Sequence, residues 1–562
     1  MKKKIIVVLL LVILLGSIFV LKYLKKDNVY VPEVDYQDEI IWEDIESSNI
    51  SFNDIEVIGD NNGYVVDNNT LTIKAGGSYY LSGTYNGHIV VDSKSEVYLI
   101  FNNLVINSSN NSAINIINAE KVIINLEENS VNTLNDENSN TEYNATIYSS
   151  DDLVIMGSGT LNINANNHAI SCKDTLQIID GTYNINAVND AIRGKDYLAI
   201  KTGIFDIKTS SDGLKATNEE DKTLGYVVID GGTFNIDVAK DAIQAITTLT
   251  INNGTFNINT EKSTTSSKGI KSGDTIIIND GTFNLNTYDD SIHGVNVYIK
   301  GGTFEIDSGD DAIHGDSILQ IDNGIINIID SYEGLEATEI TINDGTIHLK
   351  SSDDGINAAG GNDSSGMGGF GGRPGDRFQS SNGKLLINGG YIYVDADGDG
   401  IDINGSGKIN DGTVIISGPT NSGNGSLDYD STFDVNGGLF IATGSSGMLQ
   451  SPSSSSSQYV LSIGFNTYLN SAVCVDGLIT ILPNKNYQSL IVSSPDLIKG
   501  STYKIYTECE VSGEGKDGIY EKSTLGTLYT SATISNIITT VGNQMNNGMG
   551  GMGGMMPPGG RR

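Results

Sequence analysis

The segments Gly281-Thr-Phe-Asn-Leu and Gly302-Thr-Phe-Glu-Ile are two copies of one short repeat that runs through the middle of the chain. Successive copies are separated by 22, 22, 29, 22, 27, 21, 22, 21, 45 and 22 residues. A spacing near 22 residues predicts a solenoid, in which each repeat packs only on its neighbours. The copies begin at Gly159, Gly181, Gly203, Gly232, Gly254, Gly281, Gly302, Gly324, Gly345, Gly390 and Gly412.

Each copy alternates apolar and polar residues. Tyr183 and Ile185 alternate with Thr182 and Asn184, and a period of two is that of a β-strand. About 22 residues fit one coil of a parallel β-helix, whereas a helical hairpin repeat needs more than ~30. We therefore predict an all-β parallel β-helix whose aromatic residues stack in the core and do not form a sugar platform. These residues are Tyr183, Phe205, Phe234, Phe256, Phe283 and Phe304, beside the aliphatic column from Ile185 to Ile306.

The N-terminal residues indicate export. Lysines flank an apolar run of 17 residues from Ile5 to Leu21. This run is at the short limit for a membrane-spanning helix and longer than the ~7–15 apolar residues of a signal peptide. We predict an uncleaved signal anchor over residues 1–27, a transmembrane helix that makes the only membrane contact. A cleaved signal peptide is the alternative. The body then lies on the extracellular face of the membrane or is secreted.

The rest of the chain divides by composition. Residues 28–60 are acidic and are predicted to form a stalk, and residues 61–541 the β-helix, with a Gly-rich insert at 359–383. Residues 457–541 are expected to be capping strands that prevent edge-to-edge association. Residues 542–562 are predicted to be a disordered Gly/Met-rich tail. We expect a monomer.

The charge of the chain restricts its partners. With 33 Lys+Arg and 69 Asp+Glu, the net charge is −36. Nucleic acid is excluded as a partner, because phosphate binding requires clustered basic residues. Cations, neutral surfaces or anions bridged by cations are expected instead. Three cysteines cannot form a disulfide framework. Pairing of Cys474 with Cys509 stays open, but three buried thiols, Cys172 included, are the preferred interpretation.

Aligned coils share three polar columns. The first precedes the repeat glycine, as Asp180, Asn253 and Asp280 do, and we attribute it to turns with positive φ. The second is mostly acidic, and stacked charges ~4.8 Å apart repel each other unless cations neutralise them. Calcium is preferred over magnesium and over a solvated ridge without ions. The second column is His168, Asp190, Asp212, Asp241, Lys268, Asp290, Asp311, Glu333, Asp354 and Asp399, with Asp289, Asp310 and Asp353 beside it.

The third column lies three residues after the second. We expect its Arg193, Lys215 and Lys271 to pair with sugar carboxylates, and its His293 and His314 to hydrogen-bond sugar hydroxyls. Salt bridges from the cations to the acidic column are the alternative for each lysine taken alone. The full column is Ser171, Arg193, Lys215, Gln244, Lys271, His293, His314, Glu336, Asn357 and Asp402.

A combination of motifs resembles a known family. The Asp-Asp-Gly-Ile turns, the segment Ile-Tyr-Ser-Ser-Asp-Asp-Leu at 147–153 and the segment at 77–85 resemble exported bacterial carbohydrate-binding domain proteins, common in clostridia. The resemblance covers about residues 60–540. It implies a pectate-lyase-like right-handed β-helix, calcium on the acidic turns and binding of acidic polygalacturonate. Lys268 and His168 depart from the acidic pattern. The matching acidic positions are Asp190, Asp212, Asp241, Asp289, Asp290, Asp310, Asp311, Asp353 and Asp354.

Three functions remain open at this point. The first is calcium-dependent binding of acidic polysaccharide at the cell surface, in which calcium bridges protein and sugar carboxylates. The second is a calcium-dependent polysaccharide (pectate) lyase, which needs a Lys or Arg base. A base beside carboxylates has a raised pKa, which suits this role poorly, and fold kinship does not transfer activity. The third is a non-catalytic surface adhesin or scaffold.

Overall fold

In a computed structural model of the chain, the described residues are 32–37, 47–59, 62–137, 143–261, 266–359 and 382–542. The chain separates into a short unit, residues 1–35, and a large unit, residues 36–562; the fold described below is that of the large unit. Its described residues form strands and turns and no helix. No helix long and apolar enough to span a membrane occurs in the described part of the chain. The signal anchor expected at 1–27 lies outside the described residues.

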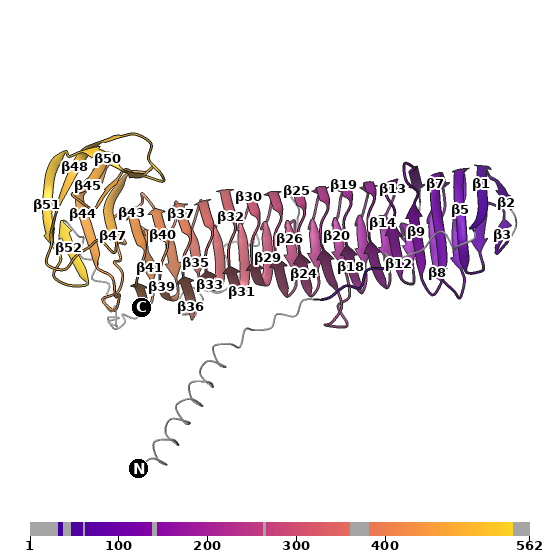
Figure 1. The fold of residues 1–562 in the computed structure, drawn as a ribbon, viewed down its shortest axis with the longest axis horizontal. Coiled ribbons are helices and arrows are strands. Elements are labelled where there is room, and N and C mark those ends of the chain that lie inside the picture. The colour runs from indigo at the N-terminus through magenta and orange to yellow at the C-terminus, as the bar shows by residue number, and fades with distance from the viewer. Residues whose placement is uncertain are drawn as a thin grey trace, which may run out of the picture. The chain divides into compact units, whose positions relative to one another are not determined.

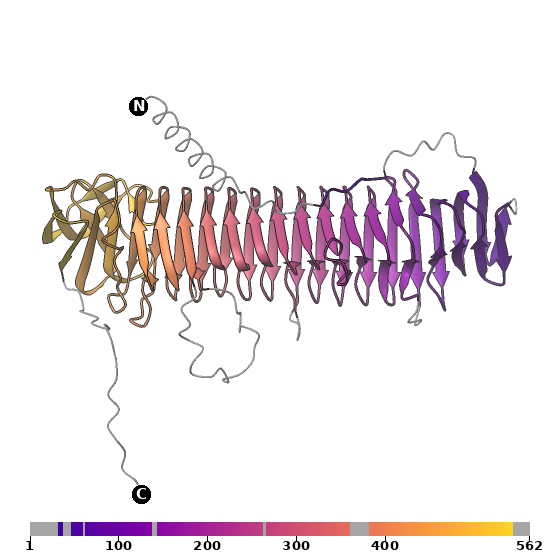
Figure 2. The ribbon, with the colours of Figure 1, turned by 90° about the horizontal axis from the view of Figure 1, so that it is seen from below.

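The large unit is a parallel β-helix, as predicted (Figures 1 and 2). Most coils contain three strands, and each strand pairs in parallel with the equivalent strand of the next coil. The first sheet contains the Gly-Thr-Phe-Asn-Ile segments. Its strands are β1 (Ser47–Asp54), β5 (Gly77–Tyr85), β7 (Val97–Ser108), β10 (Val131–Asp136), β13 (Thr160–Ala165), β16 (Thr182–Ala187), β19 (Ile204–Thr209), β22 (Thr233–Val238), β25 (Thr255–Thr260), β28 (Thr282–Thr287), β30 (Thr303–Ser308), β32 (Ile325–Asp330), β34 (Thr346–Ser351), β37 (Tyr391–Ala396), β40 (Thr413–Ser417) and β43 (Leu439–Gly444).

The second sheet follows the acidic turns. Its strands are β4 (Thr70–Ile73), β6 (His88–Asp92), β8 (Ile114–Asn118), β11 (Ala145–Ser149), β14 (His168–Cys172), β17 (Ile192–Gly194), β20 (Leu214–Ala216), β23 (Ile243–Ala245), β26 (Ile270–Ser272), β29 (Ile292–Ile299), β31 (Ile313–Ile321), β33 (Leu335–Ile342), β35 (Ile356–Ala358), β38 (Ile401–Ile403) and β41 (Asp428–Tyr429).

The third sheet leads back to the repeat glycine. The second halves of β29, β31 and β33 and the first half of β7 belong to it. Its other strands are β9 (Val122–Leu126), β12 (Leu153–Met156), β15 (Thr175–Ile178), β18 (Tyr197–Ile200), β21 (Tyr226–Ile229), β24 (Thr248–Ile251), β27 (Thr275–Ile278), β36 (Gly383–Ile387), β39 (Gly405–Ile409) and β42 (Thr432–Val435).

The predicted aromatic column is confirmed as the core. The six rings from Tyr183 to Phe304 are at most 1% exposed. Successive rings lie parallel, with centroids 4.6 to 4.9 Å apart. Parallel pairing with no shift of register places each ring above the next, for example Phe234 above Phe256. The core therefore stacks the same residue type from coil to coil.

The turn before each repeat strand needs a correction. Positive φ belongs to the repeat glycine, such as Gly181 at 127° and Gly281 at 137°, and not to the residue before it. Asp180 and Asp280 instead accept the backbone N–H of that glycine at 2.8 Å. The Asn and Asp side chains thus hold the turn by a hydrogen bond, while glycine supplies the left-handed backbone.

The stalk expected at residues 28–60 also needs a correction. Residues 47–59 form β1 and β2 (Glu56–Gly59), which extend the first sheet because β1 pairs in parallel with β5. Earlier in the chain, the Gln37 backbone N–H donates to Gln177 Oε1 at 3.0 Å, and Lys121 Nζ donates to Gln37 Oε1 at 3.1 Å. Gln37 and residues 47–59 therefore pack on the β-helix. The hairpin of β3 (Tyr64–Asp67) with β4 follows.

A further group of strands ends the stack after β43; each has an antiparallel neighbour except the last, which pairs in parallel with the first. They are β44 (Val460–Leu469), β45 (Ala472–Val475), β46 (Ile479–Ile481), β47 (Tyr487–Ser493), β48 (Thr502–Ser512), β49 (Ile519–Tyr520), β50 (Lys522–Thr524), β51 (Thr527–Thr533) and β52 (Ile538–Gly542). A disulfide joins Cys474 and Cys509, against our preference for free thiols. The antiparallel pairing of β45 with β48 brings these two residues together, which sequence spacing alone does not show. Cys172 is free and buried.

The aromatic stack gives a direct test of the core. Replacing Phe256 by Ala removes a ring packed on both faces, and such changes cost about 3–5 kcal/mol. We expect a clear fall in the urea denaturation midpoint. The matched control is Ile204→Thr. Ile204 lies in the first sheet next to the core residue Phe205, but its own side chain is 54% exposed. This substitution should change stability by no more than ~0.5 kcal/mol. Equal effects of the two changes would contradict the stacked core.

Candidate functional site

The turn between the first and second sheets holds the acidic column. Backbone hydrogen bonds fix its register, because Ala191 N donates to Asp212 O at 2.9 Å and Gly213 N donates to Asp241 O at 3.0 Å. The same bond joins Gly269 N to Asp290 O at 3.0 Å. The residues aligned from sequence therefore lie one above another along the described coils.

The acidic side chains also bond from coil to coil. Asp212 Oδ1 accepts the backbone N–H of Asp241 at 3.1 Å, and Asp241 Oδ1 accepts that of Lys268 at 3.0 Å. Asp290 Oδ1 accepts the N–H of Asp311 at 3.1 Å. These four aspartates are at most 4% exposed. One oxygen of each of the three accepting carboxylates thus has a structural role, and the column is not a solvated ridge.

The third column lies in register on the second sheet. Its neighbouring residues pair directly, as Arg193 does with Lys215 and His293 with His314. The column changes character along the β-helix, from basic through histidine to acidic. In order it contains Ser171, Arg193, Lys215, Gln244, Lys271, His293, His314, Glu336, Asn357, Asp402 and Asp428. We call this set the second-sheet column.

In the N-terminal half, the cations of the second-sheet column neutralise the acidic column. Arg193 lies 3.3 Å from Asp190, and Lys215 Nζ lies 2.5 Å from Asp212 Oδ2. Lys271 Nζ lies 2.9 Å from Asp241 Oδ2. The structure therefore contains salt bridges within the protein, which were the alternative to pairing of these cations with sugar carboxylates.

Lys268 and His168, the two residues that depart from the acidic pattern, also contact carboxylates in or beside the acidic column. Lys268 Nζ contacts Asp289 Oδ1 at 2.7 Å and forms a second ion pair with Asp290. His168 Nδ1 lies 3.4 Å from Asp190 Oδ2, and burial lowers the pKa of His168 to about 4. Both oxygens of Asp190, Asp212, Asp241 and Asp290 are thus engaged, and we no longer expect calcium at these four.

A basic hollow opens beside this half. Its volume is about 420 Å³, and its cationic lining is Lys173, Arg193, Lys195 and Lys215. Burial, and then the charges of Arg193 and Lys195, lower the pKa of Lys173. Arg193 and Lys215 are already paired with Asp190 and Asp212, so Lys173 and Lys195 are the cations of this hollow that favour an anionic ligand.

The two predicted histidines lie in the middle of the second-sheet column. His314 is fully buried, so it is not placed to meet a sugar hydroxyl, and His293 is half-buried. Burial opposes its charge, but hydrogen bonds to Asp290 and Asp316 raise the pKa of His293 to about 9. Both rings contact carboxylates.

The C-terminal half has acids without cationic partners. Burial, and then Asp311, raise the pKa of Glu333 to about 9, and burial, then Asp399, raise that of Asp354 to about 8. Burial and Asp399 raise the pKa of Asp402 to about 7, and burial raises those of Asp399, to about 6, and Asp428. No salt bridge to Lys or Arg reaches any of these acids within the described coils.

An unpartnered oxygen marks the same place. Asn357 Nδ2 donates to Glu333 Oε2 at 2.8 Å, but the buried Asn357 Oδ1 accepts no hydrogen bond from the described residues. Asp402 is its register neighbour, and Asp399, Asp402 and Asp428 can place one oxygen each within 4.8 Å of one another. We call Asn357, Asp399, Asp402 and Asp428 the acid cluster. Oxygen ligands of this kind suit calcium.

Sequence reasoning placed Asp399 and Asp402 in columns but did not select them as ligands. Asp428 lies beyond the repeated glycines, so its place above Asp402 depends on the β38–β41 pairing. Of the other expected ligands, Asp311 accepts the Glu333 N–H and lies by His314. Asp289 and Asp310 group with Asp290, and Asp353 lies beside Asp354.

The sequence matches a described family over the coils up to residue 369, a region that does not include Asp399, Asp402 or Asp428 of the acid cluster. Residues 67–312 and 295–369 match the family "Carbohydrate-binding domain-containing protein". The chain belongs to this family. A carbohydrate-binding domain-containing protein of Acetivibrio thermocellus is 35% identical over 144 residues, which are 24% of this chain and 50% of the relative. The chain thus spans about half the length of the curated relative it matches.

One solved structure is also similar, with 32% identity and a TM-score of 0.38. It is described as the polysaccharide lyase-like protein from C. thermocellum, a gadolinium derivative. The similar region covers 42% of this chain and 97% of that one.

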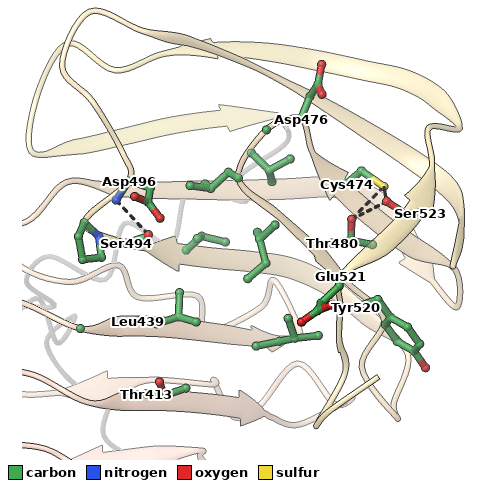
Figure 3. Close-up of a pocket in the computed structure, with 18 of the residues that line it drawn as sticks. Thr413, Leu439, Cys474, Asp476, Thr480, Ser494, Asp496, Tyr520, Glu521 and Ser523 are labelled. Atoms are coloured by element: carbon green, nitrogen blue, oxygen red, sulfur yellow. Dashed lines mark hydrogen bonds between the residues drawn. The ribbon is translucent and has the colours of Figure 1, made fainter. Parts of the chain in front are cut away.

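A further cleft of about 820 Å³ lies in the antiparallel cap, outside the residues that match the carbohydrate-binding domain family. Figure 3 shows Asp476, Asp496 and Glu521 around it, with Leu439 on its floor. The Asp496 backbone N–H donates to Ser494 Oγ at 3.1 Å. The second-sheet column lies largely within the matched residues and is therefore the stronger candidate.

Lys268 gives a test of how the acidic column is neutralised. Lys268→Ala removes the ammonium group from the fully buried Asp290 and leaves only His293 beside it, and breaking a buried ion pair costs about 3–5 kcal/mol. We expect a lower denaturation midpoint. Lys350→Ala is the control, because the Lys350–Asp330 pair is more than half exposed and contributes at most ~1 kcal/mol. A loss no larger than in the control would disprove this role.

The raised pKa values predict a pH dependence in the absence of divalent cations. An acid with a raised pKa in the folded state stabilises the fold fully below its ordinary pKa, near ~4, and this contribution is lost as the pH rises through the folded value. For Asp354 the loss extends to about pH 8. In EDTA, the melting temperature of Asp354→Asn relative to the unmodified protein should therefore increase from pH 5 to pH 9. A constant difference would argue against a strained Asp354.

Proposed function

We propose that this protein binds acidic polysaccharide of the polygalacturonate type along the second-sheet column, with calcium at the acid cluster. The charge sequence of that column supports the proposal: cations in the first coils, histidines in the middle and unneutralised acids in the last. A uniformly acidic surface would repel such a polymer. The family assignment supports a carbohydrate as the ligand.

The basic hollow can bind sugar carboxylates directly. Lys195 is available there, because its side chain is 38% exposed and its partner Glu220 is 3.6 Å away and 85% exposed. An exposed pair of this kind is weak and readily exchanged. A sugar carboxylate in the hollow would gain charge-assisted hydrogen bonds, which are about twice as strong as neutral ones.

The acid cluster can bind the same polymer only through a cation. Its side chains offer carboxylate oxygens and the unpartnered Asn357 Oδ1, and calcium takes 6–8 oxygen ligands at ~2.3–2.6 Å. A calcium ion with protein ligands on one side can complete its shell with sugar carboxylates. Display at the outer face of the membrane or secretion, as expected from residues 1–27, agrees with an extracellular glycan and is part of the proposal.

A polysaccharide lyase is the second candidate, favoured by Lys173. Its lowered pKa suits a general base better than the ion-paired Arg193, Lys215 or Lys271 do. β-Elimination would transfer the C5 proton beside the sugar carboxylate to Lys173 Nζ, form the C4–C5 double bond and break the C4–O bond, and the leaving sugar oxygen would take a proton from water. Unsaturated uronide products that vanish in Lys173→Ala would support this activity. If no such product forms in the presence of calcium, the lyase activity is rejected and only the binding function remains.

The binding proposal is tested with polygalacturonate in calcium and in EDTA. We expect binding to weaken strongly in EDTA, and the double variant Asp399→Asn/Asp402→Asn to lose the calcium-dependent part. Lys195→Ala should weaken binding about tenfold in both conditions, which is the ~1.4 kcal/mol of one charge-assisted hydrogen bond.

Lys350→Ala is the matched control for charge, because Lys350 is exposed on the first sheet and should bind as the unmodified protein does. Neutral glucan and galactan provide the control for ligand charge. Equal binding to neutral and acidic glycans, or no binding in either condition, would refute the proposal.

A further inference from the structure

Two histidines stack on adjacent coils of the second sheet. His293 on β29 and His314 on β31 are register partners, and their ring centroids are 4.5 Å apart. The chain has five histidines in 562 residues, so two of them on adjacent coils are not expected from composition alone. The pair lies between the basic hollow and the acid cluster and belongs to neither.

Carboxylates fix the Nδ1 atoms of both rings. His293 Nδ1 lies 2.5 Å from Asp290 Oδ2. His314 Nδ1 lies 3.1 Å from both Asp311 Oδ2 and Glu336 Oε2. A carboxylate on one ring nitrogen sets the tautomer and orients the other nitrogen as a ligand, and metal-binding histidines almost always have such a partner.

The Nε2 atoms of both rings face one carboxylate oxygen. Asp316 Oδ1 is 3.3 Å from His293 Nε2 and 3.6 Å from His314 Nε2. His314 is fully buried, and its Nε2 has no hydrogen-bond partner. A polar atom left without a partner in the interior costs roughly 1–3 kcal/mol. The geometry of the second-sheet column thus leaves a ligand atom unused.

These distances are long for hydrogen bonds, that of His293 to Asp316 included, and fit two ligands of one metal ion. N–H···O bonds are ~2.9–3.0 Å long, whereas two ligands of one tetrahedral ion, each bonded at ~2.0–2.2 Å, lie about 3.3–3.6 Å apart. The rings must tilt towards each other, because the two Nε2 atoms of one ion also need that separation. Asp290, Asp311, Asp316 and Glu336 outnumber the nearby cations Lys268 and His293, so a dication is electrostatically favoured.

We propose that His293 Nε2, His314 Nε2 and Asp316 Oδ1 bind a divalent transition metal of the zinc type. Imidazole ligands select such ions, whereas calcium takes oxygen ligands only. The metal would replace the proton on His293, since metal binding to histidine releases protons. Asp316 is 41% exposed, so a fourth position can face the solvent on the surface that carries the second-sheet column. This site does not depend on the proposed glycan binding.

The test is zinc titration of the untagged full chain by calorimetry after removal of metals, with cobalt absorption spectra as the second measurement. We expect one zinc per chain and a cobalt spectrum of nitrogen and oxygen ligands. Substituting a residue that only supports a metal ligand weakens metal binding ~10–100-fold. Asp316→Asn and His293→Gln replace ligands and should weaken zinc binding by more than this. Asp311→Asn should fall within that range.

His88→Gln is the control, because His88 is a half-buried histidine of another coil and should leave the titration unchanged. Asp399→Asn/Asp402→Asn should bind zinc normally, and excess calcium should not displace it. The absence of stoichiometric zinc binding, or equal affinity in Asp316→Asn and the unmodified chain, would overturn the site. Circular dichroism of each variant shows whether a loss reflects misfolding. None of these measurements uses a glycan.

Discussion

The backbone hydrogen bond between one coil and the next is the interaction on which the structure depends. It sets a rise of ~4.8 Å per coil and places equivalent residues directly above one another. Inside, this register stacks Phe205, Phe234 and Phe256 with nearly parallel rings. Outside, it stacks equivalent polar side chains in the same way. The apolar core and the charged face are therefore two results of one geometric rule.

Stacking has opposite energetic effects on the two kinds of side chain. Identical rings gain contact area, whereas identical charges repel each other. The chain resolves the repulsion by pairing Asp190, Asp212 and Asp241 with its own cations. Lys268 departs from the acidic pattern because Asp289 and Asp290 need a buried partner. Towards the C-terminus no cation among the described residues pairs with Asp354 or Asp402, and this difference divides the face into two chemical regions.

Features that depend only on periodicity were predictable from the sequence. These include the coil, the buried aromatic column and the membership of both charged columns. Features that depend on distances across the fold were not. The spacing of Arg193 and Asp190 is compatible with a sugar ligand or a salt bridge, and only the position of the side chains decides. The Cys474–Cys509 disulfide depends on antiparallel strands that have no repeat. The strand at Ser47–Asp54 was also missed, because the acidic composition of residues 28–60 indicated a stalk.

Each coil contacts mainly the coil before it and the coil after it. A single coil can therefore be gained or lost as a unit during evolution. Duplication or deletion of one 22-residue segment in the gene would leave every other coil with an intact interface. It would lengthen or shorten the charged face by ~4.8 Å and shift the boundary between its basic and acidic regions by one step. Related chains can thus differ in the length of this face, with no redesign of the core.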